Sequence, residues 1–115
     1  MTHYKNLSEL IKEIVNCSIQ GRIYFQKSKI DDLTNAEYWV ISSKEGKEVD
    51  YIEDKGGRMT PEPLVKFDVK SLLDIQTFQD IIDLKLENNP ELSIEETDVF
   101  LEAIIYYLEN DDFLD

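Results

Sequence analysis

The chain has 115 residues, of which 12 are Lys or Arg and 25 are Asp or Glu, so its formal net charge is −13. This charge counts against binding to nucleic acid or anionic membranes, and it favours encounter with basic proteins. Apolar residues make up 42% of the chain, with six Tyr, five Phe and one Trp among them, which excludes wholesale disorder. The length predicts a single domain spanning residues 1–115.

The sequence also bears on the cellular compartment. Cys17 is the one cysteine, so an intramolecular disulfide is excluded and a reducing compartment is expected. The first six residues lack the apolar run of a signal peptide, and no stretch approaches the roughly 20 apolar residues that span a bilayer. We therefore expect a cytoplasmic protein.

A helix is predicted to begin at Leu7 and to end near residues 16–18. Asn6 is its expected cap, and Glu9 stands three residues later as in a capping box. Apolar residues at helical spacing predict its buried face: Leu7, Leu10, Ile11, Ile14 and Val15. Because His3 precedes this helix near the chain end, we expect it in a frayed segment.

The middle of the chain is predicted to form strands. Residues 22–26 and 37–42 are rich in β-branched and aromatic side chains. Residues 45–47 predict a hairpin turn into a third strand at residues 48–52. Residues 64–67 predict a short edge strand, because the preceding proline argues against a central one.

Some basic residues lie beside aromatic residues in this half. Arg22, Lys27 and Lys29 are close in sequence to Tyr24 and Phe25. However, residues 1–60 hold nine basic and ten acidic residues, so this half is nearly neutral. We interpret Lys27 and Lys29 as protection of a sheet edge. Arg58 follows a Gly-Gly pair that is too short for a phosphate-binding loop and lacks its Lys-Ser/Thr.

Two helices are predicted to close the chain. Asp74 is expected to cap the first, which runs to about residue 87 and buries apolar residues at helical spacing: Ile75, Phe78, Ile81, Ile82 and Leu86. A capping box of Ser93 and Glu96 predicts that the second begins at Ile94 and continues to about residue 109. The expected class is α+β, a small antiparallel sheet of three or four strands with three helices, in the order α-β-β-β-(β)-α-α.

The last predicted helix has an unusually broad apolar side. At 100° per residue, its apolar residues from Phe100 to Leu108 cover roughly 200° of the circumference. The remaining side is acidic, over roughly 60°. That stripe contains Glu95, Asp98, Glu102 and Glu109. We therefore predict a mostly buried helix with a narrow acidic stripe, and we place Tyr106 and Tyr107 in the core with their hydroxyl groups at its rim.

The residues that could support catalysis are few. His3 is the one histidine, and a dyad with Cys17 is conceivable only if the first helix brings them together. One Cys and one His do not make a four-ligand zinc site. The acidic pairs Glu95-Glu96 and Asp111-Asp112 leave weak divalent binding open, but there is no Asp-x-Asp-x-Asp-Gly calcium loop. We expect a protein that is not an enzyme and holds no cofactor.

Negative charge is concentrated in the second half of the chain. Residues 61–115 hold three basic and fifteen acidic residues, a net charge of −12, against −1 for residues 1–60. From Leu86 to Asp115 there are ten acidic residues and no basic one. A one-sided distribution of this kind favours a basic protein as the partner.

Two stretches resemble a family of small bacterial domains of unassigned function. They are residues 78–83, Phe-Gln-Asp-Ile-Ile-Asp, and residues 103–113, an Ala-Ile-Ile-Tyr-Tyr helix followed by an Asp-Asp-Phe tail. The size, acidity and layout are also similar to immunity proteins of contact-dependent growth inhibition and related polymorphic toxin systems. The detailed match covers about the last third of the chain.

This resemblance implies a role but no set of functional residues. The implied role is stoichiometric binding and neutralisation of a cognate toxin, such as a nuclease with a basic active-site surface. Our candidate partner-binding residues are acidic ones and one apolar anchor: Glu95, Asp98, Glu102, Asp111, Asp112 and Phe113. The alternatives are an acidic nucleic-acid mimic or regulatory adaptor that binds a basic site on a host protein, and a small enzyme that uses Cys17 or a carboxylate pair. The oligomeric state stays open.

Overall fold

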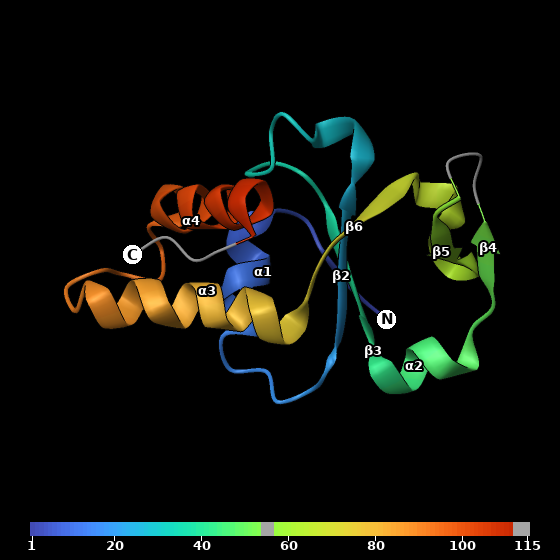
Figure 1. Ribbon diagram of the computed structural model, residues 1–115, viewed down its shortest axis with the longest axis horizontal. Coiled ribbons are helices and arrows are strands. Elements are labelled where there is room, and N and C mark those ends of the chain that lie inside the picture. Colours follow the sequence, from blue (N-terminus) through green and yellow to red (C-terminus); the bar gives the residue numbers. More distant parts are fainter. Residues whose placement is uncertain (54–56, 112–115) are drawn as a thin grey trace.

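The computed structural model describes residues 1–53 and 57–111, which form three layers with a four-stranded antiparallel sheet in the middle (Figure 1). The strand order is β1-β3-β2-β6. The bounds of these strands are Thr2–Tyr4 for β1, Gly21–Gln26 for β2, Tyr38–Ser42 for β3 and Val69–Asp74 for β6. The expected α+β class with an antiparallel sheet is confirmed.

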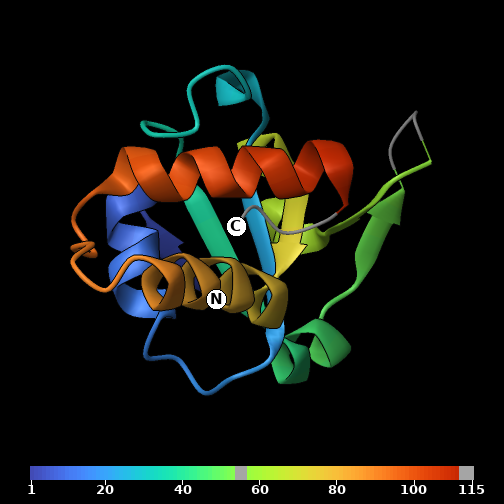
Figure 2. The same ribbon diagram turned by 60° about the vertical axis from the view of Figure 1, so that its left-hand side comes forward.

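Three helices cover one face of this sheet (Figures 1 and 2). They are α1 (Leu7–Ile14), α3 (Ile75–Asn88) and α4 (Thr97–Asn110). The other face is covered by α2 (Ser43–Glu48), the hairpin of β4 (Tyr51–Glu53) and β5 (Met59–Pro61), and the 3-10 helix η2 (Glu62–Phe67). A second 3-10 turn, η1 (Lys27–Lys29), follows β2.

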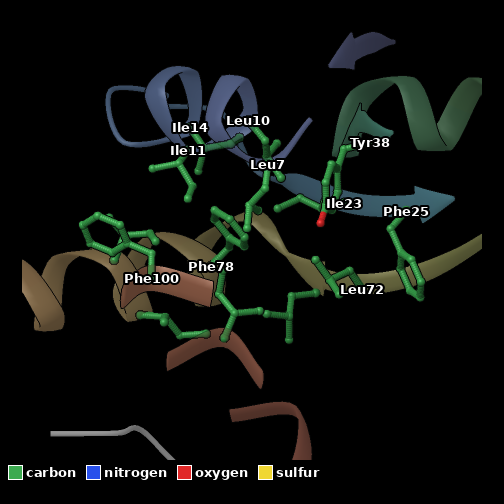
Figure 3. Packing of buried hydrophobic residues seen from close by; sticks show 14 of the residues in the cluster. Leu7, Leu10, Ile11, Ile14, Ile23, Phe25, Tyr38, Leu72, Phe78 and Phe100 are labelled. Atoms are coloured by element: carbon green, nitrogen blue, oxygen red, sulfur yellow. The ribbon is translucent and has the colours of Figure 1, made fainter. Parts of the chain in front are cut away.

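The main core lies between the sheet and the three helices (Figure 3). Leu7, Leu10, Ile11 and Ile14 point inward from α1, as their spacing predicts. Phe78 of α3 and Phe100 of α4 are completely buried among them. Alternate residues of β3 divide between the two faces of the sheet, so Tyr38 and Val40 join this core while Trp39 and Ile41 face the other layer.

A smaller core lies on the second face of the sheet. It contains Tyr24 of β2, Trp39 and Ile41 of β3, Leu64 of η2 and Val69 of β6. These residues come from segments up to 45 positions apart in the chain, and they attach the hairpin layer to the sheet.

The caps of α1 and α3 confirm two sequence predictions. The Asn6 side chain accepts a hydrogen bond from the Glu9 amide at 2.9 Å. The Glu9 carboxylate accepts from the Lys5 amide rather than from Asn6, so the box is displaced by one residue. The Asp74 carboxylate accepts from both the amide and the hydroxyl of Thr77. Both helices therefore begin where a polar side chain satisfies their first free amides.

The hairpin turn predicted at residues 45–47 is wrong. This segment is inside the short helix α2, which begins after Ser42 with a complete capping box. The Ser42 hydroxyl accepts from the Glu45 amide, and the Glu45 carboxylate accepts from the Ser42 amide. The chain thus turns through a helix, and the next strand begins at Tyr51 instead of residue 48.

The edge strand predicted at residues 64–67 is also wrong, because this segment forms η2. Pro63 fits the start of a 3-10 helix, where a missing amide hydrogen costs nothing. The strand that completes the sheet follows immediately as β6.

The N-terminal segment is not frayed, since β1 pairs with β3 and sets His3 opposite Trp39. The last helix begins at Thr97 rather than Ile94. The expected partners do meet, because the Glu96 carboxylate accepts from the Ser93 amide at 2.8 Å. However, the Ser93 hydroxyl accepts from the Glu95 amide. This hydrogen bond forms a turn that precedes the helix and is not part of its first helical turn.

Candidate functional site

The predicted acidic residues lie on the side of α4 that faces away from α1 and α3. Asp98 and Glu102 are exposed and four positions apart, so they share one side of the helix. Glu109 is exposed two turns further along the same side. Three carboxylates of the predicted acidic stripe therefore share one solvent-facing side of α4.

Glu95 and Asp111 flank the helix without being part of it. The Glu95 carboxylate lies 3.7 Å from the Lys12 ammonium of α1, and both side chains are well exposed, so this ion pair is weak. Asp111 is exposed and adopts a left-handed conformation with φ of 53° immediately after the helix. Asp112 and Phe113, the other two predicted residues, lie outside the described residues.

The expectation that α4 is mostly buried is wrong. Its buried residues are Phe100, Ala103 and Ile104, whereas Ile105, Tyr106 and Leu108 are 38%, 37% and 42% exposed. The cause is the position of α4 in the layer: it packs on α3 and α1, and its opposite side faces solvent. Packing on one side cannot cover a 200° arc, so part of the apolar sequence is left outside.

Apolar and acidic side chains consequently alternate on one surface, which we call the outer face of α4. It consists of Asp98, Glu102, Ile105, Tyr106, Leu108 and Glu109. Ile105 follows Glu102 by three residues, which places its side chain next to that carboxylate, and it follows Asp98 by seven, which places it two turns along the same side of the helix. Tyr106 is therefore not the core residue that the sequence predicts, whereas Tyr107 is half-buried against the core.

His3 and Cys17 lie on opposite faces of the sheet. The His3 ring is 5.1 Å from the ring of Trp39, on the hairpin side, and its Nε2 is 2.8 Å from a Glu37 carboxylate oxygen. Cys17 is half-buried against the helix-side core. The Gln79 side-chain amide donates to the Cys17 and Ile14 carbonyls, closing the end of α1. The sheet separates the two groups, so they do not form a catalytic dyad.

No metal centre is formed within residues 1–53 and 57–111. No three side chains of His, Cys, Asp or Glu in these ranges come together in a group that could hold a metal ion. The acidic pair Glu95-Glu96 is used in the turn before α4 and in the contact with Lys12. No helix in the same part of the chain has the length and apolar character needed to cross a bilayer.

A second surface was not predicted from the sequence. A cavity of about 430 Å³ lies between the sheet and the β4–β5 hairpin, lined by residues of β2, β6 and the hairpin. It shares Arg22, Tyr24 and Tyr51 with a neighbouring cavity of about 420 Å³ beside α2. It shares Arg58, Thr60 and Val69 with a smaller one of about 170 Å³ beside η2. We call this continuous depression the hairpin cleft.

Two short segments of the sequence carry basic residues that line the hairpin cleft. Arg22 is two residues from Tyr24 in one strand, and Arg58 follows a Gly-Gly pair in a different segment. Nothing in the local sequence shows that these segments meet, because their contact depends on how the hairpin folds over the sheet. No family model, curated protein or solved structure matches this chain.

Proposed function

We propose that this protein is an inhibitor that binds a basic protein through the outer face of α4. The observation that carries the proposal is the exposure of Ile105 one turn after the carboxylate of Glu102, with Asp98 exposed one turn before Glu102 and Leu108 exposed one turn after Ile105. Neither residue type is informative alone, because isolated apolar residues and acidic stripes are both common on protein surfaces. Together they combine the apolar anchors and the charge of a specific interface.

The two kinds of side chain have different roles in this proposal. Ile105, Tyr106 and Leu108 provide apolar area that is removed from water in the complex, which stabilises it by about 25 cal/mol per Å². The carboxylates attract a positively charged partner over a distance and raise the association rate, an effect that added salt weakens. A stable complex of this kind buries about 1,600 Å² in total, so the contact would extend beyond α4.

The specific form that we propose is an immunity protein in the cytoplasm that neutralises a cognate toxin. The acidity of the chain fits a toxin with a basic substrate-binding surface, such as a nuclease. Occupation of that surface, or of a neighbouring one, would exclude the negatively charged substrate. The alternative, an adaptor or nucleic-acid mimic that acts on a host protein, uses the same surface and differs in the identity of the partner.

The test is binding to the protein encoded next to this one, measured by calorimetry with both purified proteins. We expect a tight complex at low salt that weakens by about tenfold or more near 500 mM NaCl. Glu102→Lys and Ile105→Asp should each weaken it by at least about tenfold, or roughly 1.4 kcal/mol. Asp31→Lys provides the matched control, because Asp31 is an exposed carboxylate in the loop between β2 and β3.

Two results would contradict the proposal at different levels. If the neighbouring protein does not associate at low salt, the immunity role is lost. If it does associate but Glu102→Lys weakens it no more than Asp31→Lys, the interface is not on α4. A toxin gene directly upstream favours the immunity role, whereas its absence favours the adaptor.

A further inference from the structure

The hairpin cleft carries an excess of positive charge, in contrast to the acidic chain as a whole. Five basic side chains line its three cavities: Lys27, Arg22, Lys47, Arg58 and Lys70. Two acidic ones, Asp68 and Asp74, lie among them, so the lining has a net charge of +3. The chain as a whole carries −13. Five of its 12 basic residues therefore gather at a single depression.

Arg22 is held in place at the centre of this cleft. Its Nε donates a 2.6 Å hydrogen bond to the Ser71 hydroxyl on the neighbouring strand β6. The charge of Arg22 also acts on two neighbouring groups: it partly offsets the rise that burial causes in the pKa of Tyr24, and it adds to the hydrogen bonds from Thr77 that lower the pKa of Asp74. A guanidinium group whose direction is set by two paired strands is suited to bind a phosphate or carboxylate without a large loss of side-chain entropy.

The remaining wall is aromatic. Tyr24 is only 5% exposed, and its burial raises the pKa of its hydroxyl. Tyr51, on the hairpin, is 40% exposed and forms the opposite side. Gly46 leaves room for Tyr51, since a Cβ there would lie 3.0 Å from the Tyr51 hydroxyl oxygen. The cleft thus presents a ring surface beside its cationic groups.

We propose that the hairpin cleft binds a small organic phosphate that carries a flat ring, of the kind found in nucleoside monophosphates. Arg22, Arg58 and Lys70 line the central cavity and match a phosphate with two negative charges. Tyr51 provides a face on which the ring stacks. The cavity volume of about 430 Å³ is within the range of small-ligand sites.

Charge also decides between a small ligand and a polymer. A nucleic-acid strand would extend beyond the cleft and would be repelled by a molecule whose net charge is −13. A mononucleotide places its charge inside the cleft only. The site lies on the hairpin side of the sheet and α4 lies on the other, so this proposal does not depend on the proposed inhibitor function (Figure 1).

The test uses the full chain labelled with ¹⁵N and titrated separately with AMP, adenosine, inorganic phosphate and a ten-nucleotide DNA strand. We expect AMP to shift the amide signals of Arg22, Tyr51, Thr60 and Ser71 and to leave those of α4 unchanged. Adenosine and phosphate should each bind at least about tenfold more weakly than AMP, because each lacks one of the two groups recognised.

Variants connect the binding to named side chains. Lys70→Gln and Arg58→Gln should each weaken AMP binding by about three- to tenfold. Lys44→Gln is the matched control, because Lys44 is exposed on α2 outside the cleft lining. Arg22→Gln should have the largest effect, and urea unfolding of this variant shows whether the Arg22–Ser71 bond is needed for folding.

Several outcomes would overturn the proposal. One is that AMP at millimolar concentration causes no shifts around the cleft. Another is equal binding of phosphate and AMP, which removes the ring from the recognition. Tighter binding of the DNA strand than of AMP would show that the cleft serves a polymer. Unchanged AMP affinity in both Lys70→Gln and Arg58→Gln would place the phosphate elsewhere.

Discussion

At the scale of single residues, Tyr38 shows how a polar group is accommodated in the core. Its side chain is buried between α1 and the sheet (Figure 3). Its hydroxyl donates a 2.5 Å hydrogen bond to the Leu33 carbonyl, which joins the loop before β3 to that strand. Burial, and secondarily the charge of Asp32, raise the pKa of this hydroxyl far above its ordinary value of 10.0.

We predict that Tyr38→Phe lowers the free energy of unfolding by about 1–2 kcal/mol, because it leaves the Leu33 carbonyl unsatisfied. Urea unfolding measures this change, with the exposed Tyr106→Phe as a control that should be neutral. In the native protein, the stability due to Tyr38 is fully present below the pKa of an unfolded Tyr, 10.0, and is lost as pH rises above it. Tyr38→Phe should therefore show a shallower decline above pH 10; an equal decline would contradict the assignment.

At the scale of elements, the start of α3 depends on Asp74. Burial alone would raise the pKa of Asp74, but hydrogen bonds from Thr77 and the nearby charge of Arg22 lower it below its ordinary value of 3.8. The ionised carboxylate is thus the form that caps the helix. Stability from this cap is present above pH 3.8 and is lost as pH falls through the lower pKa of the folded state.

We predict that Asp74→Ala costs about 1 kcal/mol at neutral pH, the usual value for loss of a helix cap. Asp74→Ser should recover most of this loss, since a hydroxyl can accept the Thr77 amide hydrogen. Thermal unfolding at pH 7 and near pH 3 separates the contribution of the carboxylate charge from that of the hydrogen bond with Thr77. A loss for Asp74→Ala that is as large at pH 3 as at pH 7 would show that the carboxylate charge has no part in the cap.

The elements that the sequence predicted are those whose signals are local. The N-terminal helix and α3 each have a capping residue followed by apolar residues at helical spacing. The strands β2 and β3 are rich in β-branched and aromatic residues. In contrast, β1 is three residues long and exists because it pairs with β3, which lies more than 30 positions away. Pairing of this kind leaves no local pattern.

The candidate site also has features that local sequence predicts and features that depend on distant contacts. Glu102 and Asp98 could be placed on one side of a helix from spacing alone. The exposure of Ile105 could not, because it depends on how much of α4 its neighbours cover. The hairpin cleft was missed for a related reason, since Arg22 and Arg58 approach one another only after the hairpin has packed on the sheet.

At the scale of the whole molecule, charge is arranged by face. Carboxylates gather on α4 and at its ends, and basic groups gather in the hairpin cleft on the other side of the sheet. The excess of acidic residues also means that most carboxylates repel one another at neutral pH.

We predict that salt stabilises this protein by screening that repulsion. Raising NaCl from about 20 to about 500 mM should raise the Tm by about 4 °C, or roughly 1 kcal/mol. Scanning calorimetry measures the shift, and KCl should have the same effect if screening is the cause. A Tm that falls with added salt would show that the attractive pairs, such as Lys12 with Glu95, outweigh the repulsion.

The pairing of β2 with β6 has a consequence for how the chain is made. Arg22 of β2 is bonded to Ser71, 49 residues later, and the last carbonyls of α1 are closed by Gln79, more than 60 residues after them. Because synthesis runs from the N-terminus, β2 and α1 leave the ribosome before these partners do. The strand β2 therefore emerges with one edge open, and the sheet is completed only after residues 69–74 of β6 have left the exit tunnel.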